Sequence, residues 1–124
     1  MAAHHHLPAK NLYLDLTPQT PLVPIQLNAD GPVVFCKLEF LNPSGSTKDR
    51  IASYILTKAW RNGTIGPESL VVEASSGSTS ISMALVCAQL GVHFVAVMPE
   101  GVSNERLLMI RAFGGEVRLS PAEV

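Results

Sequence analysis

The chain has 124 residues, of which 47% are hydrophobic and 15% are charged, and its formal net charge at pH 7 is −1. This length and apolar content predict one folded domain and exclude a disordered chain. The near-neutral charge provides no basic surface for nucleic acid or an anionic membrane, and no apolar stretch approaches the roughly 20 residues of a transmembrane helix.

The cysteines and histidines predict neither disulfides nor a metal site. Cys36 and Cys87 fall in a predicted strand and a predicted helix, so we interpret both as buried thiols of a reducing compartment, which predicts a cytoplasmic protein. No Cys/His spacing typical of metal ligands repeats, and His4–His6 is interpreted as a terminal tract. Met1–His6 also lacks the pattern of a signal peptide.

The N-terminal quarter of the chain is rich in proline, which excludes a long helix and a central strand. These prolines are Pro8, Pro18, Pro21, Pro24 and Pro32. We therefore predict an extended N-terminal arm over residues 1–32 that packs along another surface, followed by a small α/β domain over residues 33–124.

Strand and helix patterns alternate after residue 32. Runs of β-branched and aromatic residues predict four strands, and apolar residues at helical spacing predict three helices. The strands are expected at residues 33–38, 70–73, 94–98 and 116–119, and the helices at 48–61, 79–90 and 103–113. Because the connections are short, this order predicts a three-layer α/β fold with a four-stranded parallel sheet and helices on both faces.

Two short segments carry candidate chemistry. Asn42–Arg50 reads NPSGSTKDR and places Lys48 after a Gly/Ser-rich turn, at the start of a helix. Glu73–Ser80 reads EASSGSTS, and the N–H groups and hydroxyls at the start of the next helix form a site for a carboxylate or phosphate. Because both segments are expected to follow the carboxyl ends of parallel strands, we predict that they converge on one edge of the sheet.

Each segment also has an ordinary structural interpretation. Lys48 alone fits a surface lysine in a first helical turn, Ser75–Thr79 fits an N-cap, and Asn42–Gly45 fits a turn. An amine facing a hydroxyl-lined anion site favours instead Schiff-base chemistry on an amino acid, with Lys48 as the nucleophilic amine.

Residues 37–50 resemble the Schiff-base segment of the fold-type II pyridoxal-phosphate enzymes, the cysteine synthase and cystathionine β-synthase family. The resemblance implies that Lys48 binds pyridoxal 5'-phosphate covalently and later removes the Cα proton of the substrate. It also implies a loop that binds the substrate carboxylate, formed by Ser75, Ser76, Gly77 and Thr79. It covers nearly the whole chain from about Thr17 onward.

Two positions depart from the pattern of this family. Ser78 stands where the family usually has an asparagine that hydrogen-bonds the ring hydroxyl of the cofactor, and Ser80 replaces a common glycine. A serine is shorter and has no amide, so we expect the cofactor contact of Ser78 to be lost or bridged by water. Both changes affect the expected reaction more than the expected cofactor.

Members of this family are considerably longer than this chain. Their glycine-rich phosphate cup and the residue that meets the pyridine nitrogen are not found in these 124 residues. The chain therefore resembles the N-terminal arm and the small substrate-closing domain, without the second, larger domain. We expect a truncated product with weak or no cofactor binding, little or no turnover, and self-association through the surface left by the missing domain.

The resemblance implies a pyridoxal-phosphate dependent β-replacement or β-elimination on a small amino acid, by a transferase or lyase of amino-acid biosynthesis. Two alternatives stay open. A serine/threonine dehydratase-like lyase shares both segments, and a non-catalytic α/β module could use them to bind an anion or a partner. A nucleotide-binding Rossmann domain is disfavoured, because no G-x-G-x-x-G follows a predicted strand.

Overall fold

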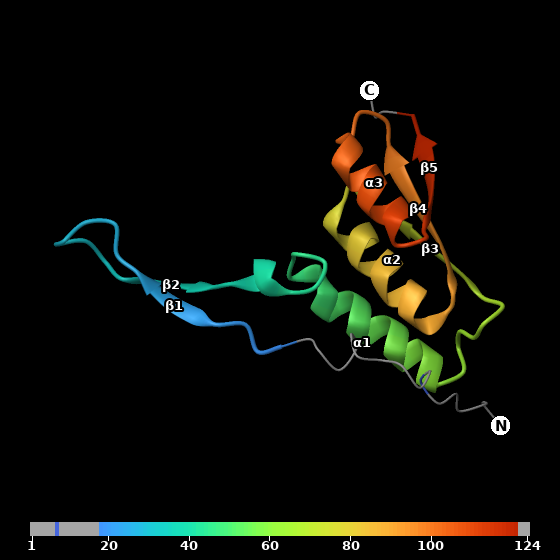
Figure 1. The fold of residues 1–124 in the computed structure, drawn as a ribbon, viewed down its shortest axis with the longest axis horizontal. Helices are drawn as coiled ribbons and strands as arrows, with labels where there is room; N and C mark the ends of the chain where they lie inside the picture. Colours follow the sequence, from blue (N-terminus) through green and yellow to red (C-terminus); the bar gives the residue numbers. More distant parts are fainter. Residues whose placement is uncertain (1–6, 8–17, 122–124) are drawn as a thin grey trace.

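The computed structural model describes residue 7 and residues 18–121, which form an α/β body with a long hairpin extending from it (Figure 1). The elements, in chain order, are β1 (Leu22–Ile25), β2 (Val34–Lys37), the 3-10 helix η2 (Glu39–Leu41), α1 (Lys48–Arg61), β3 (Leu70–Ala74), α2 (Ser78–Leu90), β4 (His93–Pro99), α3 (Asn104–Ala112) and β5 (Glu116–Ser120). His4–His6 and half of the predicted arm lie outside the described residues.

The central sheet has three parallel strands in the order β3-β4-β5, so the predicted four-stranded sheet is wrong. The strand expected at residues 33–38 forms as β2, but it pairs antiparallel with β1, with Pro24 opposite Phe35. The prolines excluded a central strand before residue 33, and β1 agrees with this, because a two-stranded ribbon tolerates proline where the outward edge of each strand needs no partner. The residues expected to form the fourth strand of the parallel sheet therefore belong to the β1-β2 hairpin.

The described helices cover one face of the sheet, which also corrects the expectation of helices on both faces. Phe94, Ala96 and Met98 alternate along β4 and share one hydrophobic core with α1, α2 and α3. Leu70 and Val72, on the opposite face of β3, are 59% and 55% exposed. The strand order explains this, because two right-handed crossovers that step in the same direction place both connecting helices on the same side.

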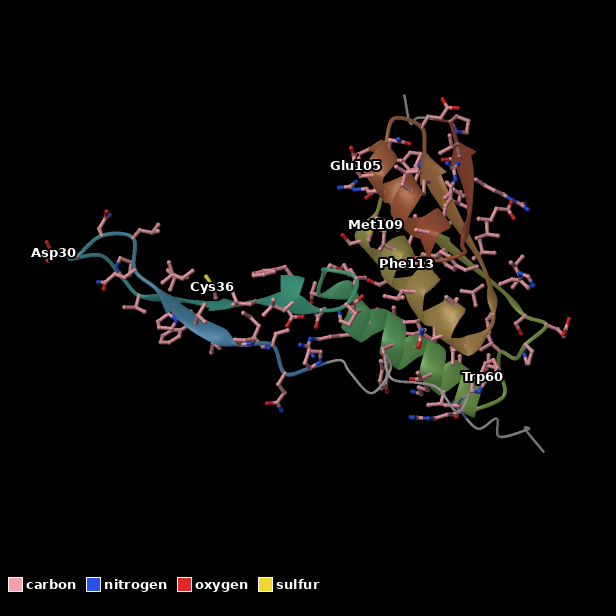
Figure 2. All side chains as sticks on the ribbon, in the orientation of Figure 1. Asp30, Cys36, Trp60, Glu105, Met109 and Phe113 are labelled. Atoms are coloured by element: carbon pink, nitrogen blue, oxygen red, sulfur yellow. The ribbon has the colours of Figure 1, made fainter. Side chains whose placement is uncertain are left out.

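Helix α2 lies at the centre of the body, in contact with α1, α3, β3 and β4 (Figure 1). Helix α1 packs against it through a stripe formed by Ala52, Leu56 and Trp60, and Figure 2 shows Trp60 near the C-terminal end of α1. Helix α2 ends at Gly91, whose φ of 69° is the left-handed conformation that glycine adopts readily at helix ends. Because α2 is buried between α1, α3 and the sheet, these elements all pack against it.

The two cysteines differ in environment, and neither forms a disulfide. Cys87 is buried in α2, and burial raises the pKa of its thiol to about 12. Cys36 is only partly buried on the hairpin, whose tip carries Asp30 (Figure 2), so the expected burial is correct for Cys87 alone. None of the described helices has the length and apolar character needed to cross a membrane.

A polar cluster around Glu39 fastens the hairpin to α1. The Glu39 carboxylate accepts hydrogen bonds from Arg50 Nε at 2.8 Å, Arg50 Nη2 at 2.9 Å and Asn42 Nδ2 at 2.9 Å, and from the Thr20 hydroxyl. Lys37 Nζ lies 3.5 Å from Glu39 Oε1. These donors, Arg50 first, hold the pKa of Glu39 well below its ordinary value.

We expect acid to weaken the attachment of the hairpin. Because the pKa of Glu39 is depressed in the folded chain, its stabilisation is complete above the ordinary value of 4.5 and is lost as the pH falls below it. Glu39→Gln should therefore lower the free energy of unfolding more at about pH 7 than at about pH 3. Urea denaturation of both variants at both pH values measures this.

Glu116→Gln is the matched control, because Glu116 forms an exposed ion pair with Arg118 on β5, far from the hairpin in sequence. It should change stability little at either pH. An effect of Glu39→Gln that is the same at both pH values would contradict the assigned role of this carboxylate.

Candidate active site

The turn before Lys48 is held by a buried carboxylate. Asp49, which is 0% exposed, accepts the Ser44 backbone N–H at 2.8 Å and also the Ser44 hydroxyl. The Asn42 side-chain amide donates to the Ser46 carbonyl at 2.9 Å, and the Lys48 backbone N–H lies 3.2 Å from Ser46 Oγ. These contacts fix the backbone on both sides of Lys48.

Lys48 opens α1, as predicted from the sequence, and its side chain is partly buried. Its ammonium group forms no hydrogen bond or ion pair with any residue that the structure describes. The rigid turn therefore presents an amine that is not committed to another protein group.

The Ser75–Thr79 loop includes the connection from β3 to α2 and the first two residues of α2, and the Ser75 side chain folds back onto the helix. Ser75 Oγ accepts the Ser80 backbone N–H at 3.1 Å and lies 2.7 Å from Ser80 Oγ. The Gly77 N–H points toward the same oxygen at a long 3.5 Å. Ser76 and Ser78 are exposed and Thr79 is partly buried, so hydroxyls and backbone N–H groups gather at the start of α2.

Arg106 of α3 covers this loop, a contact that the sequence did not reveal. Its Nη1 donates to the Ser76 carbonyl at 2.7 Å. A Cβ atom at Gly77 would lie 2.8 Å from Arg106 Cδ and 2.9 Å from its Nε. Residue 77 must therefore lack a side chain for the guanidinium to approach so closely. Arg106 and Ser76 are 30 residues apart, so no local pattern links them.

The two candidate segments meet through α2 and not through adjacent strand ends. Ser44, from the turn before Lys48, has its Oγ 2.8 Å from the Oγ of Ser82 in α2. Helices α1 and α2 pack side by side with their N-terminal ends on the same side of the pair (Figure 1). Both segments therefore contact α2, but the strand that was expected to place the Lys48 turn at the edge of the sheet lies outside the sheet.

A cavity of about 450 Å³ lies beyond the carboxyl ends of β3, β4 and β5. It is lined by Ala74, Ser75, Ser76, Val97, Pro99, Ser120 and Pro121. This is where parallel α/β sheets commonly bind ligands, and here Ser75 and Ser76 of the loop line its wall.

Comparison with known proteins agrees with this geometry. The family described as pyridoxal-phosphate dependent enzyme matches residues 13–124. Over 110 residues the chain is 46% identical to cysteine synthase B of Campylobacter jejuni, an alignment covering 89% of this chain and 36% of that protein. It is 42% identical over 113 residues to a probable cysteine synthase of Bacillus subtilis, covering 88% and 36% of the two chains.

A crystal structure of O-ureido-L-serine synthase has the same fold, with a TM-score of 0.82 and 40% sequence identity. The matched region covers 92% of this chain and 36% of the synthase chain. The chain thus spans about a third of the length of the relatives it matches. The family match over residues 13–124, together with this shared fold, shows that the chain belongs to the pyridoxal-phosphate dependent enzymes, in the cysteine synthase family.

Proposed function

We propose that this chain supplies the amino-acid-binding part of a pyridoxal-phosphate dependent enzyme that replaces or eliminates a group at Cβ. The observation that carries the proposal is the attachment of both candidate segments to α2. Ser44 of the Lys48 turn contacts Ser82, and Ser75 of the loop contacts Ser80. The turn that precedes Lys48 and the proposed anion site are thereby both attached to one buried helix.

The described residues fit part of the cofactor. Lys48 offers the amine, Ser78 offers an exposed hydroxyl at the first position of α2, and the cavity at the strand ends adjoins the loop. When bound, pyridoxal phosphate supplies an electron sink for negative charge developing at the substrate Cα. A glycine-rich phosphate cup is not present among the described residues, so we propose that this chain alone binds the cofactor weakly.

The residues of this chain would bind, orient and deprotonate the substrate. Backbone N–H groups at the start of α2 and the hydroxyls of Ser75, Ser76 and Thr79 would hold the carboxylate. Holding that group fixes the direction of the Cα–H bond. Lys48, in its neutral form, would then accept the Cα proton as general base.

The two alternatives differ in their products. Replacement of the Cβ substituent by sulfide indicates the cysteine synthase type, whereas release of a keto acid and ammonia indicates a dehydratase. The similarity to cysteine synthase B, at 46% identity, favours the first. Saturable binding of an amino acid by a chain that gives neither product indicates the non-catalytic module.

Location and association are also proposals. Cys36 and Cys87 form no disulfide, and this supports the proposal of a cytoplasmic protein. The exposed apolar side chains of Leu70 and Val72 on the sheet, and of Phe35 on the hairpin, support self-association.

Lys48 is expected to be the residue that reacts with pyridoxal phosphate. Titration of the purified chain, followed by borohydride reduction and peptide mapping, should give saturable labelling at Lys48, and Lys48→Ala should lose it while remaining folded. Lys58→Ala is the matched control, because Lys58 is an exposed lysine of the same helix. Labelling spread evenly over Lys10, Lys37 and Lys58, or unfolding of Lys48→Ala, would contradict this assignment.

Asp49→Ala should loosen the turn that presents Lys48. The substitution leaves the Ser44 N–H and hydroxyl without their buried acceptor, which costs about 1–3 kcal/mol in free energy of unfolding. The rate of labelling at Lys48 should change with it. Urea denaturation and labelling kinetics measure the two effects.

The matched control for this change is Glu68→Ala, which removes an exposed carboxylate and should alter stability by less than about 0.5 kcal/mol. If Asp49→Ala were as stable as this control, Asp49 would not be the residue that fixes the turn.

A further inference from the structure

We propose that Arg106 is a positioning residue that turns the Ser76–Gly77 peptide so that its N–H faces the bound carboxylate. The inference rests on the proposed function of the Ser75–Thr79 loop as a carboxylate site. Arg106 belongs to α3, an element that no sequence pattern placed at the site.

The hydrogen bond from Arg106 sets the direction of the Ser76–Gly77 peptide group. Arg106 Nη1 donates to the Ser76 carbonyl at 2.7 Å, so this carbonyl points toward α3. No peptide bond in the described residues is cis, and in a trans peptide the C=O and the following N–H point in opposite directions. The Gly77 N–H must therefore point away from Arg106, and it does face Ser75 Oγ.

The Gly77 N–H keeps most of its capacity to bind a ligand. Its distance of 3.5 Å from Ser75 Oγ exceeds the usual range for an N–H···O hydrogen bond, so this contact is weak. Ser75 Oγ is instead engaged by the backbone and hydroxyl of Ser80. The Gly77 N–H is therefore oriented by the loop and can still donate a hydrogen bond to an anion at the start of α2.

The packing explains why this peptide needs an external support. Gly77 has no Cβ, which lets Arg106 lie across it, but glycine also leaves the backbone freer to rotate than any other residue. The hydrogen bond from a charged guanidinium is stronger than a neutral one and polarises the peptide, which makes its N–H a better donor. The residue that makes room for Arg106 is thus also the residue whose flexibility Arg106 restrains.

The charge of Arg106 is available to an anion. Arg50 and Arg118 each pair with a glutamate, whereas Arg106 forms no ion pair with any residue between 18 and 121. Because Arg106 is exposed, its attraction for a carboxylate is screened by salt, and its main contribution is the orientation of the peptide.

The test follows the backbone amide and carbonyl NMR signals of the full chain during titration with L-serine. L-serinamide, which lacks the carboxylate, is the control ligand. L-serine should shift the Gly77, Ser78 and Thr79 amides saturably. Arg106→Ala should weaken this binding about tenfold, the effect of losing one charge-assisted contact. It should also move the Ser76 carbonyl and Gly77 amide signals before any ligand is added.

Arg111→Ala is the control variant, since it removes the same charge from the last turn of α3 and should change neither readout. Arg106→Lys, which keeps a donor for the Ser76 carbonyl, should recover part of the affinity. Wild-type affinity for L-serine in Arg106→Ala, or unchanged Ser76 and Gly77 signals in the ligand-free variant, overturns the inference.

Failure of the proposed function gives a different pattern. If the wild-type chain binds L-serine no better than L-serinamide, the loop is not a carboxylate site, and Arg106 loses its functional role with it. The ligand-free Ser76 and Gly77 signals still report whether Arg106 holds the peptide, so the two failures are distinguishable.

Discussion

Two buried hydroxyl groups on α2 are the constraint on which the site depends. Ser80 and Ser82 are both 0% exposed, and each finds its partner in a different loop, Ser80 in Ser75 and Ser82 in Ser44. A buried hydroxyl without a partner costs about 1–3 kcal/mol. Helix α2 can therefore occupy the centre of the body at low cost only when both loops are in place, so the packing of one helix also assembles the candidate site.

The Lys48 turn connects this core to the hairpin. Asp49 binds Ser44 on the side of α2, while Arg50, the next residue, binds Glu39 on the side of the hairpin. Asn42 joins the two networks, because its side-chain amide donates to both Glu39 and the Ser46 carbonyl. A displacement of the hairpin would therefore reach the backbone around Lys48 through a few short contacts. The hairpin thus helps to support the candidate site.

Local patterns predicted the elements well, and the sequence predicted their partners poorly. The helix expected at residues 48–61 forms with those bounds, and the three strands of the sheet are displaced by at most one residue at either end. Residues 33–38 were expected in the parallel sheet because of the alternating order of strands and helices, but they pair with β1, whose proline is compatible with a two-stranded ribbon. The face on which the helices lie depends on strand order, which periodicity does not contain. The contact between Arg106 and Ser76 joins two surface segments and has no periodic signal at all.

One of the two departures from the family pattern, Ser80, has a structural role in this chain. Ser80, at a position where a glycine is common, is buried and holds the Ser75 hydroxyl against the helix. A glycine there would leave that hydroxyl with the backbone N–H of residue 80 and the long contact from Gly77, and free it to turn toward a ligand. In the proposed site, backbone N–H groups would accordingly contribute more to carboxylate binding, and the Ser75 hydroxyl less. The orientation of the Ser76–Gly77 peptide, and hence Arg106, matters more in this chain for the same reason.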